Sequence, residues 1–201
     1  MNKQEKTLLG LQMFDAVLGS WFSIWWIKVF SEMLSGETLS TAQIIRNASS
    51  IVVIYFVIKK YENPSPVAVV GIALFTYTGL FTLMVSPEVF WLVSTFLSVF
   101  CSAVAGTFIT SLKAQNINGA RRNQYDNREN LIFNIGAMIG GGLALVFLAE
   151  DIPYWFVWLM TFMIFDIDMW IRFFLVKKGF FKYDRSYNVN EFCLHAKANT
   201  N

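Results

Sequence analysis

The sequence predicts an all-α fold: a polytopic membrane bundle of six transmembrane helices with both termini on the cytoplasmic side. Composition, run length and the placement of basic residues support this prediction. Of the 201 residues, 55% are hydrophobic and 17% aromatic, but only 15% are charged. A soluble domain contains about 25% charged residues, and a chain of this size has too little interior for so many apolar side chains. We therefore expect the lipid bilayer to surround the bundle.

The apolar runs are continuous and close to the length of about 20 residues that a helix needs to cross a bilayer core. A membrane barrel would instead show alternating segments of about ten residues. The predicted spans are Leu8–Phe30, Thr41–Ile58, Val67–Val85, Val89–Leu112, Leu131–Ala149 and Tyr154–Val176. We accordingly expect one transmembrane domain over residues 1–176 and a cytoplasmic tail over residues 177–201.

Each span is bounded by charge, proline or polar residues. The first follows Lys3 and Lys6, but Asp15 and Lys28 interrupt it and no small-residue cleavage site follows, so we expect it to be retained and not removed as a signal peptide. The later spans are bounded in turn by Lys59 and Lys60, Pro66, Pro87, Lys113, Arg128, Pro153 and Lys177.

The orientation follows from the connections between spans. Lys and Arg lie before span one and after spans two, four and six, whereas the loops at 36–40, 86–88 and 150–153 contain neither residue. Short loops rich in Lys and Arg stay in the cytoplasm. We therefore expect the chain to cross the cell membrane several times, with both termini on the cytoplasmic side.

Several polar residues interrupt the apolar runs and are candidates for a cavity or a substrate-binding site. Asp15 shares a helix face with polar or small neighbours on span one, and the outer half of span two is also unusually polar. Charges inside a span are costly and usually face protein or water. The candidates are Gln12, Asp15, Ser23, Trp26, Arg46, Asn47 and Ser98, with structural packing as the alternative interpretation.

Two further patterns concern helix packing. Asp168 and Arg172 are one turn apart near the inner end of span six, a spacing that predicts an intramembrane ion pair. Gly136, Gly140 and Ala144 recur every four residues on span five. Small residues at this spacing let helix backbones approach closely, and they predict either tight packing or a gate.

The residues do not predict an enzyme. His195, the single histidine, lies beside Cys193 in the polar tail, far from Cys101 in span four, so neither a cysteine nucleophile with its base nor a metal site is expected. Gly140 to Gly142 lie inside a span and not in a phosphate-binding loop. We expect no cofactor, and topology explains the basic residues without nucleic acid.

The stretch Arg121–Asn130, leading into Asn134–Gly142 with its repeated glycines, resembles the loop and fifth helix of one half of a major facilitator superfamily transporter. The resemblance covers most of the chain in topology and about 25 residues in motif. It implies that helices one and four line a central cavity, that helices two and five meet a second half, and that helices three and six face lipid. Complete members contain two such halves, so a homodimer or a second half-transporter chain is implied.

The loop Lys59–Pro66 departs from this family, because it lacks the Gly and Asp that are expected between helices two and three. The leading hypothesis is a half-sized, major-facilitator-like protein that forms a pathway for an unknown small solute as a dimer. One alternative is the substrate-binding membrane subunit of a multi-component importer. Another is a non-transporting accessory or immunity protein, which the altered loop favours.

Overall fold

The computed structural model describes residues 1–33, 87–149, 152 and 154–185, with short pieces at 36, 40–41, 44–45, 47–48, 51–52, 55, 64–66, 68–69 and 71. The long helices in these ranges are α1 (Lys3–Met33), α4 (Pro87–Asn116), α5 (Arg122–Ala149) and α6 (Tyr154–Lys177). A short 3-10 helix, η1 (Gly119–Arg121), joins α4 to α5. The all-α prediction therefore agrees with the described part of the chain.

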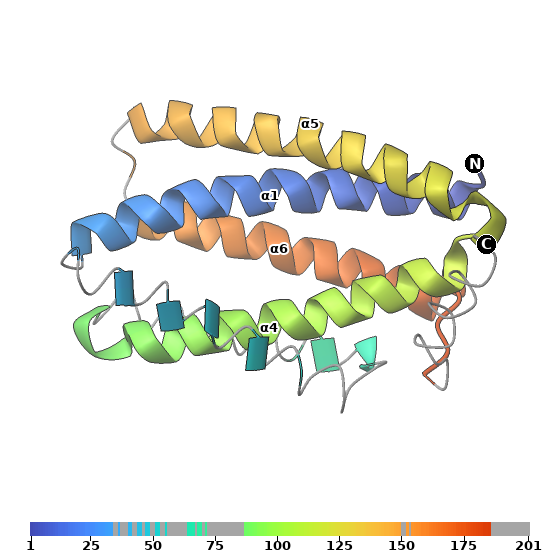
Figure 1. Ribbon diagram of the computed structural model, residues 1–201, viewed down its shortest axis with the longest axis horizontal. Coiled ribbons are helices and arrows are strands. Elements are labelled where there is room, and N and C mark those ends of the chain that lie inside the picture. The colour runs from blue at the N-terminus through green and yellow to red at the C-terminus, as the bar shows by residue number, and fades with distance from the viewer. Residues whose placement is uncertain are drawn as a thin grey trace.

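Helix α1 is the central element of the arrangement (Figure 1). It contacts α5, α6 and α4, and its contact with α5 is the most extensive. The colour gradient in Figure 1 shows that α1 and α5 run in the same direction, whereas α4 and α6 run in the opposite direction. The beginning of α1 and the segment after α6 lie at one end, where Gln4 Nε2 donates to the Phe180 carbonyl oxygen at 2.6 Å.

The core forms where α1, α4, α6 and the segment after α6 meet. Its buried members include Leu8 from α1, Phe108 and Leu112 from α4, Met169 from α6 and Phe181 beyond α6. Each fully buried large apolar side chain contributes about 1.5 to 3 kcal/mol relative to exposure to water. The core thus joins segments that are far apart in the sequence.

The start of α1 and the end of α6 both have identifiable caps. At the start of α1, Glu5 N donates to Asn2 Oδ1 at 2.7 Å and Asn2 N donates to Glu5 Oε2 at 2.9 Å, a reciprocal capping box. At the end of α6, Gly179 has φ +70°, Gly179 N donates to Val176 O, and Phe180 N donates to Leu175 O. This pattern is a Schellman motif, in which glycine adopts the left-handed conformation without a steric penalty.

The prediction of six transmembrane helices was wrong. Among the described residues, two helical stretches are long and apolar enough to cross a membrane, Lys3–Trp25 and Gly119–Leu148. Predicted spans two and three fall largely outside those residues, and spans four and six correspond to α4 and α6. Run length misleads because it does not weigh the charged residues that interrupt an apolar run, as Asp168 and Arg172 do on α6. The cytoplasmic orientation of the termini stays a prediction.

Candidate ion-pair site between the helices

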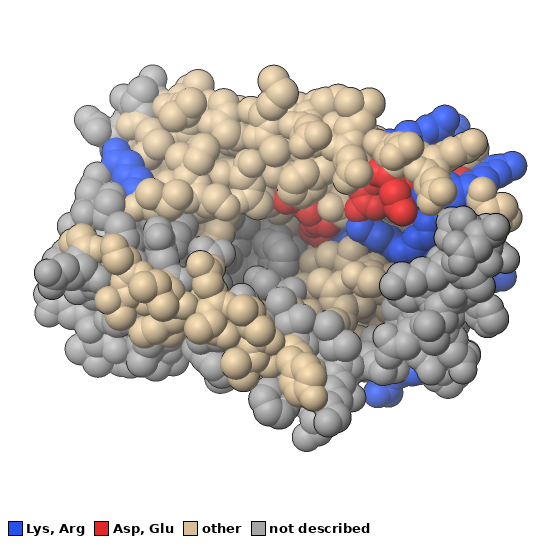
Figure 2. Space-filling model, viewed as in Figure 1, with Lys and Arg blue, Asp and Glu red and all other residues tan. Residues whose placement is uncertain are grey.

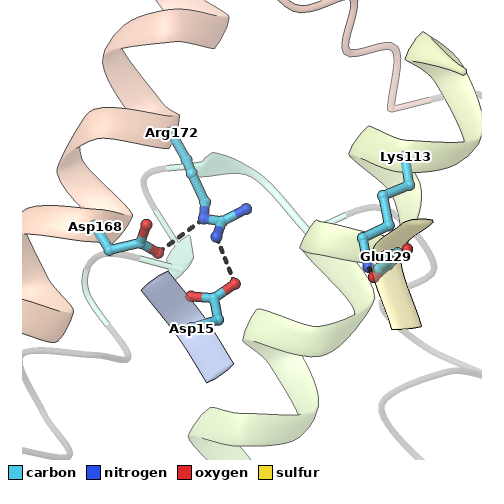
Figure 3. A network of polar contacts seen from close by, with 5 residues as sticks. All are labelled: Asp15, Lys113, Glu129, Asp168 and Arg172. Atoms are coloured by element: carbon cyan, nitrogen blue, oxygen red, sulfur yellow. Dashed lines mark hydrogen bonds and ion pairs between the residues drawn. The ribbon is translucent and has the colours of Figure 1, made fainter. Parts of the chain in front are cut away.

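Arg172 on α6 lies at the centre of a charged network, between two carboxylates (Figure 3). Its Nε donates to Asp168 Oδ2 at 2.8 Å, one turn earlier on the same helix. Its Nη2 donates to Asp15 Oδ2 on α1 at 2.5 Å. One guanidinium therefore connects α1 to α6 through two charge-assisted hydrogen bonds, which are about twice as strong as neutral ones.

The three side chains differ in exposure. Those of Arg172 and Asp168 are 1% and 0% exposed, whereas that of Asp15 is 18% exposed. When all three are ionised, two carboxylates face one guanidinium and the network carries one excess negative charge. Asp15 is the most accessible member of the network that carries this excess charge.

The second oxygen of Asp168 is a further unusual feature. Asp168 Oδ1 is buried and has no hydrogen-bond partner in the described part of the structure. A buried acceptor without a partner loses its hydration and gains nothing in exchange. Such a site favours a nearby proton donor or cation.

A second ion pair lies close to this network in Figure 3 and joins two other helices. Lys113 Nζ on α4 contacts Glu129 Oε1 on α5, and both side chains are mostly buried. Figure 2 shows acidic and basic side chains gathered next to one another on one face of the molecule. The two groups of ion pairs thus include charged side chains from all four long helices.

The structure places the other predicted cavity residues less closely together. Gln12 is partly buried, and Ser23 is exposed, with its Oγ donating to Gly19 O at 2.8 Å. Asn47 is exposed. Arg46 lies outside the described residues, as do the side chains of Trp26 and Ser98. Asp15 is therefore the predicted cavity residue that the structure brings into a defined polar network.

The small residues of α5 face α1. A Cβ added at Gly136 would lie 2.7 Å from Met13 O, and one added at Gly140 would lie 2.9 Å from the Val17 carbonyl carbon. Ala144 is fully buried. The absence of side chains at these two glycines lets the α1 backbone approach α5 directly, which explains the extent of this helix contact.

Sequence reasoning did not single out Glu129 or Lys113 as parts of a site. Lys113 was assigned to membrane topology, and Glu129 to a motif. A signal was present, because Lys113 directly follows an apolar run and a basic side chain there can reach back along the helix surface. Its partner on α5 depends on tertiary packing and could not be found from spacing.

The described residues contain no group of three or more His, Cys, Asp or Glu side chains placed to hold a metal ion. Comparison of the chain with protein-family models, with curated proteins and with solved structures finds no match. The resemblance to half of a major facilitator superfamily transporter therefore stays a prediction. The geometry of the charged network is the remaining guide to function.

Proposed function

We propose that the protein is a membrane transport protein that binds a small cationic solute at the Asp15 carboxylate. The observation that carries the proposal is the excess carboxylate in a buried network whose most accessible member is Asp15. Ionisable groups inside a membrane are expensive, so they usually serve a solute, ion or proton pathway. A cationic group would balance the charge of the site.

The exposure of the apolar helices supports the membrane location. Only 22% of the apolar window in Lys3–Trp25 and 17% of that in Gly119–Leu148 are buried in the bundle. On α5, Leu131, Met138 and Leu145 are spaced by seven residues and are all more than half exposed. Contiguous apolar surface of this kind needs lipid or a partner to cover it.

The arrangement of charges supports solute binding over a purely structural role. An ion pair that only fastens α1 to α6 needs one carboxylate, yet Arg172 contacts two, and Asp168 Oδ1 remains without a partner. Association with a second copy, as the family resemblance implies, would enclose a pathway between the two chains.

The test is a comparison of Asp15→Asn with Asp126→Asn in purified, reconstituted protein. Choline and guanidinium serve as cationic probes, and lactate serves as an anionic comparator of similar size. We expect the cations to raise the unfolding temperature and to enter proteoliposomes, and we expect Asp15→Asn to abolish both effects. Asp126 is a matched control, because its half-exposed side chain pairs with Arg122 at 3.7 Å, away from the network. Unchanged cation flux in Asp15→Asn would refute the proposal.

A second candidate function is a non-transporting accessory protein that binds another membrane protein through α5. The exposed row at Leu131, Met138 and Leu145 favours it, because such a row also fits a partner helix. The same reconstitution separates the candidates. A transport protein responds to cations when alone, whereas an accessory protein shows no stabilisation and no flux until its partner is present.

A further inference from the structure

A cavity of about 390 Å³ lies at the end of the bundle where α1 and α5 begin. We call it the end cavity, and it is lined by Met1, Glu5, Arg121, Gln124, Tyr125 and Arg128. Its volume falls in the range of about 300 to 1,000 Å³ that is typical of small-molecule sites. It is separate from the Asp15 network, with which it shares no residue.

The end cavity has two guanidinium groups that lack a counter-ion. Within the described residues, neither Arg121 nor Arg128 forms an ion pair, whereas the adjacent Arg122 pairs with Asp126. The one carboxylate in the lining, that of Glu5, is buried and accepts the Asn2 backbone N–H in the α1 capping box. The lining therefore carries one excess positive charge and favours an anion.

Tyr125 gives an independent indication of a ligand. Its side chain is 3% exposed, and its hydroxyl is buried without a hydrogen-bond partner in the described structure. A buried hydroxyl without a partner has lost its hydration and gained no hydrogen bond in exchange. Because Tyr125 also lines the end cavity, a ligand whose acceptor oxygen reached this hydroxyl would satisfy it.

The position of the end cavity identifies the source of the anion. The two candidate membrane-crossing stretches begin at Lys3 and Gly119, so residues 1, 5, 121, 124, 125 and 128 all lie within about two and a half turns of those starting points. In a bilayer, the ends of crossing helices lie at the level of the lipid headgroups. The nearest abundant anion at that level is the phosphate diester of a lipid.

We propose that the end cavity binds the phosphate group of an anionic phospholipid. Arg121 and Arg128 contact the phosphate oxygens, since guanidinium groups match phosphate geometry through paired hydrogen bonds. The Tyr125 hydroxyl donates to the same group. The proposal uses the membrane location proposed above but not solute binding at Asp15, and the two can fail separately.

The experiment titrates the purified full chain with soluble dioctanoyl phosphatidylglycerol and follows lipid adducts by native mass spectrometry. We expect Arg121→Gln and Arg128→Gln each to weaken binding about tenfold, the change that corresponds to the loss of one charge-assisted hydrogen bond. Tyr125→Phe should weaken it about threefold. Lys178→Gln is the matched control, because Lys178 is exposed and lies outside the cavity lining.

Two further arms identify the ligand. Dioctanoyl phosphatidylcholine should bind more weakly than phosphatidylglycerol, because its headgroup carries a compensating cation. Inorganic phosphate at millimolar concentration should compete poorly; complete displacement of lipid by it would overturn the lipid assignment in favour of a free phosphate. Asp15→Asn should bind lipid like the wild type, which keeps this test independent of the solute site.

Two results would overturn the proposal itself. One is wild-type affinity for phosphatidylglycerol in the Arg121→Gln, Arg128→Gln double variant. The other is an equal loss of affinity in Lys178→Gln, which would show that general charge, and not the end cavity, attracts the lipid. Tyr125→Phe provides a check that does not alter charge: unchanged lipid affinity in that variant would show that the hydroxyl has no ligand.

Discussion

Arg172 is the residue on which the interior of the bundle depends most. It is almost completely buried, and its two ion-pair partners in the described structure are carboxylates. A buried ion pair gains little net stability over a well-packed apolar pair, but the removal of one partner leaves an uncompensated charge and is strongly destabilising. The main contribution of Arg172 is therefore to neutralise the buried charges of Asp15 and Asp168, and not to add net stability.

Arg172→Leu is expected to destabilise the protein by about 3 to 5 kcal/mol, because two carboxylates then lack their shared cation. The measurement is thermal or denaturant unfolding of the purified protein in detergent. The double variant Asp15→Asn, Arg172→Leu should recover part of the loss, since it removes one of the stranded charges. Equal stability of Arg172→Leu and wild type would show that the network is not formed.

The residues of this network could be predicted only in part. Asp168 and Arg172 are four apart on one helix, so spacing alone places them on the same face. Asp15 lies 157 residues from Arg172, and its polar face indicated a protected environment without naming a partner. The pairing of Asp15 with Arg172 depends on which helices pack together, which a single sequence does not encode locally.

The packing of helix α1 against helix α5 depends on two positions that have no side chain. Gly136 and Gly140 present bare backbone to Met13 and Val17, and an added Cβ would meet main-chain atoms that have no flexible end to move aside. Beyond these glycines, Trp21 and Phe147 pack edge to face with ring centroids 4.9 Å apart. Close backbone packing at the glycines is followed along the helices by an aromatic contact.

Gly140→Ala is expected to separate α1 from α5 and to destabilise the protein by about 1 to 3 kcal/mol, the cost of overpacking a close contact. Gly142→Ala is the matched control, because an added Cβ there meets nothing within 4 Å. Because alanine has a higher helix propensity than glycine, Gly142→Ala should leave the stability of the protein unchanged or raise it slightly. Unfolding temperatures of the two variants in detergent make the comparison, and an equal effect in both would contradict the packing described.

The cap of α6 gives a second prediction for an element. Gly179→Ala should destabilise the helix end by about 1 to 2 kcal/mol, because an L-residue with a Cβ is penalised in the left-handed conformation. Gly119→Ala is a suitable comparison, since that glycine has open space for a Cβ and, unlike Gly179, does not have a positive φ. Amide hydrogen exchange at residues 175–181 measures the local effect. If the amides of residues 175–181 still exchange slowly in Gly179→Ala, the left-handed glycine does not stabilise the end of α6.

The segment after α6 is attached to α4 by side-chain amides. Asn116 and Gln115 each donate to and accept from the backbone, at Lys182 and Asp184 respectively. Between them, the Tyr183 hydroxyl donates to Pro64 O at 2.5 Å and its ring packs against Phe108. This segment therefore pairs with α4 at alternate residues, as an extended chain does.

Burial raises the pKa of Tyr183 to about 12, from an ordinary value of 10.0. Since the folded-state pKa is the higher one, the contribution of this tyrosine is present below pH 10 and is lost as pH rises towards 12. Residues 182–184 should loosen from α4 in that interval, which absorbance of tyrosinate together with hydrogen exchange can follow. Tyr183→Phe should remove this pH dependence, and an unchanged profile would assign it to another group.

The helix limits show where apolar patterning stops being informative. Hydrophobic run length predicted a fifth span from Leu131, whereas α5 already begins at Arg122. The extra turns are polar on one side and contribute the buried Tyr125 and the partly buried Glu129. The length of an apolar run gives only the part of a helix that can contact lipid. The helix itself continues for as long as its backbone hydrogen bonds and tertiary contacts are formed.

At the scale of the whole molecule, charged side chains are buried beside an apolar core, and many large apolar side chains lie on the surface. The completely buried side chains include Arg172 and Asp168, while Met138, Leu145 and Ile167 are more than half exposed. Water would favour the reverse arrangement by the transfer free energy of every such side chain. The sequence predicted this through its shortage of charge, although the number of membrane-crossing helices could not be obtained by counting apolar runs.

The membrane location leads to a prediction about single positions on α5. A spin label at Met138→Cys should be more accessible to oxygen than to a water-soluble nickel chelate in liposomes, because oxygen concentrates in hydrocarbon and Met138 is 78% exposed on the face opposite Gly136 and Gly140. Asn127→Cys, exposed near the start of the same helix, should show the reverse preference. Both labels are introduced after replacement of Cys101 and Cys193 by alanine. If the label at position 138 is accessible to the nickel chelate, α5 faces water and the protein is not embedded along this helix. If it is protected from both reagents, a protein partner covers the face, and the accessory function becomes the better account.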